Sequence, residues 1–106
     1  MQVVVLKQAQ PELKGIPRDV LIDIFSLFDD LAEGKSLSLP ISRPLPSIGK
    51  GLHELRLSGR AGEYRVFYVF KVKDAIYVLH ASMKKRQALS KQTAGLLKLR
   101  MKGILS

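Results

Sequence analysis

One short segment of the sequence, VLHASMKKRQ at residues 78–87, brings a histidine close to three consecutive positive charges. Lys84, Lys85 and Arg86 repel one another, and a chain that keeps such a cluster commonly sets it against an anionic partner. His80 lies four residues before the first lysine, and an imidazole ring can take up or release a proton near neutral pH. This combination could hold a phosphate and move a proton. A solvated loop that follows a strand is the alternative interpretation.

The net positive charge of the protein lies in the second half of the sequence. The chain has 18 Lys and Arg residues against 9 Asp and Glu residues, a net charge of +9. Basic and acidic residues balance within residues 1–51, whereas residues 52–106 hold twelve bases and three acids. Such asymmetry indicates a polyanionic partner, with nucleic acid as the first candidate and an acidic protein as the second.

Composition excludes several other kinds of site. The sequence has no cysteine, which rules out disulfides and thiolate-bound metals, and two histidines are too few for a histidine-only metal site. No apolar stretch approaches the roughly 20 residues that span a bilayer, and the first residues, MQVVVL, lack the basic flank of a signal peptide. We therefore expect one small cytoplasmic domain over residues 1–106, without a metal or other cofactor and without a membrane partner.

The first half of the chain predicts a strand, a helix and an extended loop. The β-branched run at 2–6 is typical of a strand, and a turn-rich segment with at most one helical turn follows at 11–17. Apolar residues recur at helical spacing from Pro17 to Gly34, and proline suits the first position of a helix. Residues 35–51 hold three of the five prolines, so we expect an ordered crossing loop there.

The second half predicts three strands and a final helix. Strands at 52–58, 63–72 and 75–81 are separated by links short enough for antiparallel hairpins. Ser90 can cap a last helix that has one apolar stripe and is otherwise basic. The order of elements predicts an α+β fold, in which helices pack on one face of a small twisted antiparallel sheet.

Strand alternation places two arginines on the same face of this sheet. In the first two hairpin strands the apolar residues alternate with Arg56 and Arg65, so helices that cover the apolar face leave both guanidinium groups on the open face. Guanidinium groups match pairs of phosphate oxygens. Arg56 could instead pair with Glu54 or Glu63 across the sheet, and His80, which alternates with core positions, could be a packed core histidine.

Three blocks of the sequence, GLHELRL, YRVFY and VLH followed by KK after three residues, occur in a characteristic order and spacing. They resemble the phage-derived host-addiction branch of the RelE/HigB toxin family, and the PLPSIGKGL segment that leads into them fits as well. The resemblance implies a RelE-like fold and a type II toxin that cleaves mRNA without a metal, typically in the ribosome. It also implies a co-encoded helix-turn-helix antitoxin as partner.

Carried over residue by residue, the resemblance also implies which side chains act. The implied catalytic residues are Arg56, Arg65, Lys84 and the strand histidine His80. We also expect four basic residues of the C-terminal part to contact RNA: Lys85, Arg86, Lys91 and Lys98. Either Lys84 or His80 could be the general base that takes a proton from the RNA.

The sequence departs from this family pattern in two places. Ala81, Ser82 and Met83 stand where an aromatic residue is common, and Ser90 and Lys91 occupy the region where some relatives have a tyrosine. These departures leave two alternatives open. One is a ParE-like toxin that binds DNA gyrase, and the other is a catalytically inactive module that binds nucleic acid or an antitoxin.

Overall fold

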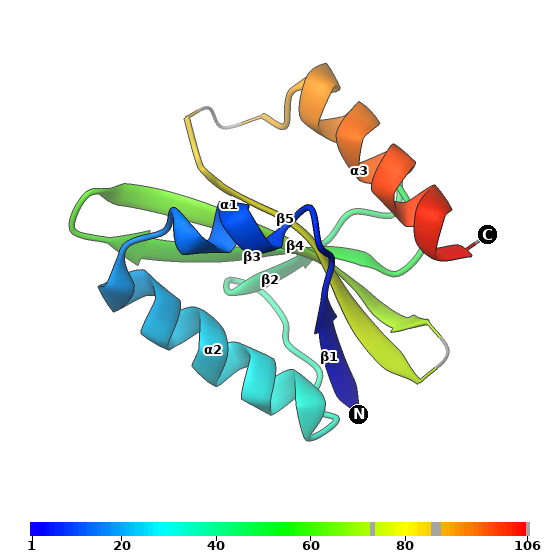
Figure 1. Cartoon of the computed structure of the whole chain (residues 1–106), viewed down its shortest axis with the longest axis horizontal. Coiled ribbons are helices and arrows are strands. Elements are labelled where there is room, and N and C mark those ends of the chain that lie inside the picture. Colours follow the sequence, from blue (N-terminus) through cyan, green and yellow to red (C-terminus); the bar gives the residue numbers. More distant parts are fainter. Residues whose placement is uncertain (73, 86–87, 106) are drawn as a thin grey trace.

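The computed structural model describes residues 1–72, 74–85 and 88–105. Within these residues the chain forms eight elements (Figure 1): β1 (Gln2–Val5), α1 (Gln10–Lys14), α2 (Arg18–Ala32), β2 (Ser42–Pro44), β3 (Leu52–Gly59), β4 (Gly62–Val72), β5 (Ala75–Met83) and α3 (Lys91–Leu105). The expected α+β fold is confirmed. Two short elements, α1 and β2, are added within the turn-rich segment and the proline-rich loop.

Five strands of the described chain form one sheet in the order β1-β5-β4-β3-β2. β3, β4 and β5 pair as the predicted antiparallel hairpins, and β2 adds antiparallel to the outer side of β3. β1 instead runs parallel to the start of β5, so the sheet is mixed rather than purely antiparallel as expected. Short links determine the hairpins, whereas β1 pairs with residues far along the chain, and no local signal sets its direction.

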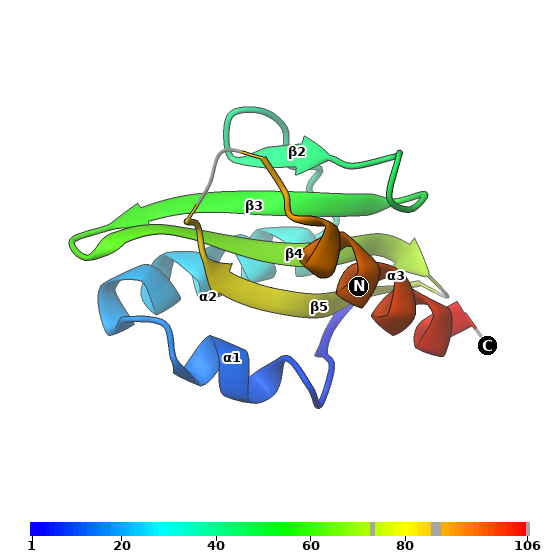
Figure 2. The same cartoon turned by 90° about the horizontal axis from the view of Figure 1, so that it is seen from above.

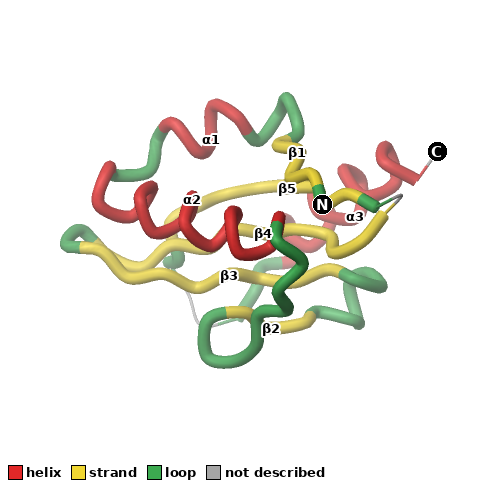
Figure 3. Tube along the Cα trace, turned by 90° about the horizontal axis from the view of Figure 1, so that it is seen from below, coloured by secondary structure: helices red, strands yellow, loops and turns green. Residues whose placement is uncertain are grey.

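Helix α2 covers one face of the sheet and α1 adds Leu13 to the same core, whereas α3 packs against Phe67 and Leu79 on the other face, although the sequence predicted helices on one face only. The helical spacing of Val20, Ile24 and Leu31 predicted a buried stripe on α2, and these residues are buried in the larger apolar core together with Leu55 and Val66 from the sheet. Figure 3 shows α2 across the strands and α1 beside the β5 edge of the sheet. Burial of this stripe stabilises the helix far more than its intrinsic propensity does.

The third helix packs over one end of the opposite face. Leu97 and Met101, one turn apart on α3, belong to a second apolar core that includes Phe67 and Leu79 of the sheet. Figure 2 shows α3 in front of the strands and α2 behind them. The part of this face that α3 does not reach carries Glu54, Arg56 and Arg65.

A β-bulge in β5 changes which face of the sheet His80 occupies. Phe67 of β4 pairs with His80, but the next residue, Tyr68, pairs with Val78, so Leu79 is an extra residue on β5. Val78 points into the core beneath α2, and regular alternation would send His80 the same way. The extra residue turns His80 to the other face, where its ring stacks on Phe67 with centroids 5.8 Å apart.

Candidate active site

Arg56 and Arg65 lie opposite one another on neighbouring strands and share a carboxylate. The two residues are register partners in the β3–β4 ladder. Glu54 of β3, only 3% exposed, places Oε1 2.9 Å from Arg56 Nε and Oε2 3.0 Å from Arg65 Nε. This carboxylate offsets the repulsion between two directly opposed cations, and the trio keeps a net positive charge. Arg56 therefore pairs with Glu54, two residues before it on the same strand, and it still lies beside Arg65.

The two arginines differ in their exposure to solvent. The Arg65 side chain is 7% exposed, whereas that of Arg56 is 34% exposed. Arg65 lies on the central strand of the sheet, where less water surrounds its charge. Because screening falls as water is excluded, Arg65 can interact more strongly with a bound anion than Arg56 can.

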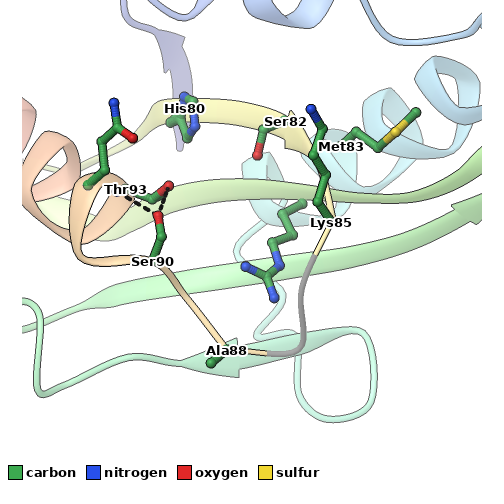
Figure 4. Close-up of a pocket in the computed structure, with 9 residues that line it drawn as sticks. His80, Ser82, Met83, Lys85, Ala88, Ser90 and Thr93 are labelled. Carbon is green, nitrogen blue, oxygen red and sulfur yellow. Dashed lines mark hydrogen bonds between the residues drawn. The ribbon is translucent and has the colours of Figure 1, made fainter.

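A pocket of about 380 Å³ opens where β4, β5 and the beginning of α3 meet (Figure 4). Its walls combine cationic, imidazole and hydroxyl groups: Arg65, His80, Ser82, Met83, Lys85, Ala88, Ser90, Gln92 and Thr93. Ser90 also caps α3 as predicted, because its Oγ accepts a hydrogen bond of 3.1 Å from the Thr93 backbone N–H. The chemistry of these walls suits a phosphate group with a hydroxyl group beside it.

His80 lies between this pocket and a network of charges from two helices. Its Nδ1 is 2.9 Å from Oε1 of Glu12 on α1, and the His80 side chain is 13% exposed. Arg100 of α3 binds both oxygens of the same carboxylate, at 2.9 and 3.1 Å, and donates a 2.7 Å hydrogen bond to the carbonyl oxygen of Leu79 in the bulge. The network joins α1, β5 and α3 at one point.

Glu12 is held in its ionised form by this network. Burial alone would raise the pKa of Glu12, but the hydrogen bonds from Arg100, the close contact with His80 and the charges of both groups outweigh burial, so the net effect lowers the pKa. A carboxyl group whose pKa is lower in the folded protein stabilises the fold above its unfolded pKa. This stabilisation is lost as the pH falls through the folded pKa.

The first prediction concerns this pH dependence. Glu12→Gln should lower the free energy of unfolding at pH 7 by roughly 1.5–3 kcal/mol, the range for hydrogen bonds to charged groups. The difference from wild type should shrink as the pH falls from about 5, because protonated Glu12 has nearly the shape and charge of glutamine. Urea unfolding at pH 7, 5 and 3 measures both free energies.

Glu33→Gln is the matched control, because Glu33 pairs only with the exposed Lys35 at the end of α2 among the contacts described. Exposed ion pairs contribute little, so this variant should lose less than about 1 kcal/mol at pH 7. A loss in Glu12→Gln that stays constant from pH 7 to pH 3 would contradict the prediction.

The structure separates the two adjacent lysines of the basic triplet. Lys85 is exposed and lines the pocket with Arg65 and His80. The Lys84 side chain is 10% exposed, its Nζ lies 4.0 Å from Glu63 Oε2, and it lines a second hollow of about 320 Å³ with Arg56. The structure thus brings three predicted residues together at one pocket, whereas Lys84 lies in the neighbouring one.

The other predicted RNA contacts lie outside the pocket or outside the described residues. Lys91 and Lys98 are exposed on α3, with Lys91 in the first turn, next to the pocket residues Ser90 and Gln92. Arg86 falls outside the part of the chain that the structure describes.

A third hollow, of about 250 Å³, adjoins the main pocket. It shares Arg65 and Ala88 with that pocket and adds Arg43 and Arg56. Arg43, next to β3 on the edge strand β2, was not among the predicted site residues. Together the three hollows are lined by five basic side chains, Arg43, Arg56, Arg65, Lys84 and Lys85, against the two acidic ones of Glu54 and Glu63.

A family described as "Phage derived protein Gp49-like (DUF891)" matches residues 11–102 of the sequence. The chain belongs to this family. The match begins next to Glu12 and ends just after Arg100, so it covers the pocket residues of the Gp49-like chain and both charged partners of His80's network. A comparison with curated proteins finds no match.

Two solved structures share the fold of the Gp49-like chain. A chain of the toxin–antitoxin complex RelBE2 from Mycobacterium tuberculosis is similar with a TM-score of 0.55 and 20% identity, over 78% of this chain and 96% of that one. The isolated RelE toxin of Escherichia coli is similar with a TM-score of 0.57 and 14% identity, over 92% of this chain and 96% of that one. The predicted RelE-like fold is confirmed.

Glu12 and Arg100 were not predicted as functional residues of the Gp49-like chain. Each looked like an ordinary charge on a helix, and 88 residues separate them. Their opposite charges are the only signal in the sequence, and such pairs are too common to identify a contact.

Within the described ranges, no helix is both long and apolar enough to cross a membrane.

Proposed function

We propose that this protein is the toxin of a toxin–antitoxin pair and cleaves mRNA as a metal-independent endoribonuclease. The observation that carries the proposal is the single pocket lined by Arg65, His80 and Lys85. A guanidinium group that stays positively charged, an imidazole ring that can accept or donate a proton and a second cation stand together there. RNA cleavage requires stabilisation of negative charge, transfer of a proton and binding of a phosphate, and these groups can provide all three.

RNA can be cut by its own 2′-hydroxyl group. The 2′-oxygen forms a bond to the adjacent phosphorus, and the bond from phosphorus to the 5′-oxygen of the next nucleotide breaks. One proton leaves the 2′-hydroxyl for a base, and another reaches the departing 5′-oxygen from an acid. The products are a 2′,3′-cyclic phosphate and a 5′-hydroxyl end, and the transition state carries extra negative charge on the phosphate oxygens.

The residues of the pocket supply these roles in the proposed reaction. Arg65 stabilises the charge that develops on the phosphate, and such preorganised stabilisation is commonly the largest catalytic contribution. His80 transfers a proton, and Lys85 binds a phosphate at the rim. Arg56 holds the neighbouring phosphate in the adjoining hollows, and Lys84 supports it there. Lys91 and Lys98 extend the basic surface along α3.

Product analysis tests the proposed reaction directly. Purified toxin incubated with RNA in the presence of a chelator should produce fragments with 2′,3′-cyclic phosphate and 5′-hydroxyl ends. Isolated ribosomes added with mRNA should show whether cleavage depends on translation. Fragments with 5′-phosphate ends, or cleavage that stops in the chelator, would contradict the proposed chemistry.

A second prediction separates the two lysines. Lys85→Gln should weaken RNA binding and lower the log–log slope of affinity against salt by about 0.7, the value for one phosphate contact on a single strand. Lys84→Gln should change the slope less, because Lys84 is mostly enclosed and lies near Glu63. Fluorescence anisotropy with a short RNA at several salt concentrations measures both slopes. Equal slopes for Lys85→Gln and wild type would show that Lys85 does not contact an RNA phosphate.

An antitoxin is the proposed protein partner. The chain shares its fold with a chain of a toxin–antitoxin complex, and its net charge of +9 favours an acidic or mixed partner surface. We propose a helix-turn-helix antitoxin that covers the basic face of the sheet. Binding that is independent of salt, with protection confined to α2, would contradict this surface.

A gyrase-directed toxin is the second candidate, favoured by the residues between His80 and the lysines. Ala81, Ser82 and Met83 include no aromatic ring on which a base could stack, and inhibition of gyrase would need none. A supercoiling assay run beside the mapping of mRNA 5′ ends after induced expression distinguishes the two. Loss of supercoiling without new mRNA ends would favour the gyrase target.

A further inference from the structure

The carboxylate of Glu12 contacts the buried nitrogen of the His80 ring. Nδ1 of His80 is shielded from solvent, and its partner in the described structure is Glu12 Oε1, at 2.9 Å. The oxygen lies off the direction of the ring N–H, so the contact is short but poorly aligned. Catalytic hydrogen bonds are often loose without substrate and tighten in the complex.

This contact determines which ring nitrogen of His80 can accept a proton. A neutral imidazole has one N–H donor and one acceptor nitrogen. A carboxylate beside Nδ1 favours the proton on Nδ1, and this leaves the lone pair on Nε2. His80 lines the pocket, so Nε2 would accept the proton of a substrate hydroxyl group there. The reverse tautomer would leave Nδ1 and Glu12 facing each other with no proton between them.

Arg100 holds Glu12 in the position that this role requires. It binds the carboxylate in the two-pronged geometry that fixes both distance and orientation. The same guanidinium group donates to the Leu79 carbonyl oxygen, and Leu79 is the extra residue that turns His80 into the pocket. One side chain therefore supports both the carboxylate and the bulge.

We infer that Glu12 is a positioning residue that keeps the His80 proton on Nδ1, and that Arg100 keeps Glu12 in place. Among the residues that the structure describes, the charged groups around the His80 ring are Glu12 from α1, Arg100 from α3, Arg65 from β4 and Lys85 after β5. Only Glu12 among them can accept a proton. The effect of Glu12 on RNA cleavage rests on the proposed function, whereas its effect on the ring does not.

The ring tautomer can be measured without any substrate. Two-bond ¹H–¹⁵N correlation spectra of the neutral rings should show Nδ1 of His80 as the protonated nitrogen in wild type. Glu12→Ala should move His80 toward the Nε2–H form. His53, the other histidine of the sequence, has Nδ1 2.9 Å from the Gly51 carbonyl oxygen and serves as the internal control, because its signals should not change.

Cleavage kinetics give the second measurement. Glu12→Ala should lower kcat by about 10- to 100-fold, less than the loss of the proton-transfer group itself, and should leave KM nearly unchanged, because Glu12 lies behind His80. Arg100→Lys, which keeps the charge but loses the two-pronged contact, should show a smaller loss of kcat and a partial tautomer shift. Glu33→Ala should match wild type in both measurements.

If Glu12→Ala does not fold, Glu12→Asp is the variant in which the His80 tautomer is measured. It keeps the charge beside Arg100 but draws the oxygen back from Nδ1, so the tautomer shift should still appear. A His80 ring that keeps its wild-type tautomer in a folded Glu12→Ala or Glu12→Asp protein would overturn the inference. A tautomer shift in a protein that does not cleave RNA would support the inference and reject the proposed function.

Discussion

Arg65→Lys should lower the rate of RNA cleavage by about 10²- to 10³-fold, the loss typical of one preorganised charge donor in a transition state, while the protein stays folded. Lysine keeps a positive charge beside Glu54 but lacks the planar pair of N–H groups that matches two phosphate oxygens. Single-turnover cleavage of a short RNA, at a protein concentration above Kd, measures the chemical step separately from binding.

Truncation of Arg65 would be a poorer test than Arg65→Lys. Glu54 is buried, and Arg65→Ala would leave its carboxylate with Arg56 alone. Breaking a buried ion pair from one side costs roughly 3–5 kcal/mol, so lost toxicity could reflect unfolding. The double variant Glu54→Gln/Arg65→Gln removes both charges of the pair, and it should fold better than Arg65→Ala while remaining inactive.

Arg60→Lys is the matched control for Arg65→Lys. Arg60 is exposed in the turn that joins β3 to β4, so the same change there should leave the cleavage rate within about twofold of wild type, as expected for surface substitutions. Cleavage by Arg65→Lys at the wild-type rate would remove Arg65 from the catalytic groups and leave it as a structural partner of Glu54.

Local signals account for the parts of the fold that the sequence could predict. The spacing of Val20, Ile24 and Leu31 is a property of one continuous segment, so α2 was predictable without its partners. The hairpins of β3, β4 and β5 were predictable for the same reason, since short links leave few ways to pair neighbouring strands. From these strands, alternation also placed Arg56 and Arg65 on one face.

Elements that depend on distant contacts were not predictable in this way. β2 is only three residues long and includes Pro44, which has no N–H and is tolerated because β2 lies at the edge of the sheet. Its pairing with β3 cannot be read from its own residues. The parallel direction of β1 is a further example, because its partner is β5.

The placement of His80 shows how one irregularity changes a site. Alternation with Ile76 and Val78 predicted the core face, and this would have separated His80 from Arg65 by the thickness of the sheet. The bulge at Leu79 reverses the face, and a one-residue shift is sufficient because side chains alternate with a period of two. No residue type at 78–80 marks the bulge. Arg100 and Glu12 stabilise it from helices that are remote in the sequence.

His80→Ala should lower the cleavage rate by about 10²- to 10⁴-fold, the range for a general acid or base, with little change in RNA affinity, because the neighbouring cations supply most of the binding. Imidazole added to the solution should restore part of the activity if the pocket admits it in place of the missing ring. His53→Gln is the control, since His53 stacks on Tyr68, whose side chain is part of the core beneath α2. A cleavage rate of His80→Ala within threefold of the wild-type rate would contradict a catalytic role and indicate that His80 is a packed histidine.

A modified substrate distinguishes the two proton transfers that His80 could perform. When sulfur replaces the 5′-oxygen at the cleaved bond, the leaving group departs without needing a proton, but the 2′-hydroxyl group still has to lose one. If His80 is the base, His80→Ala should be as defective with the sulfur substrate as with normal RNA. If His80 is the acid, the defect should largely disappear. The Nδ1 contact with Glu12 favours the first result, because it leaves Nε2 with a free lone pair in the pocket.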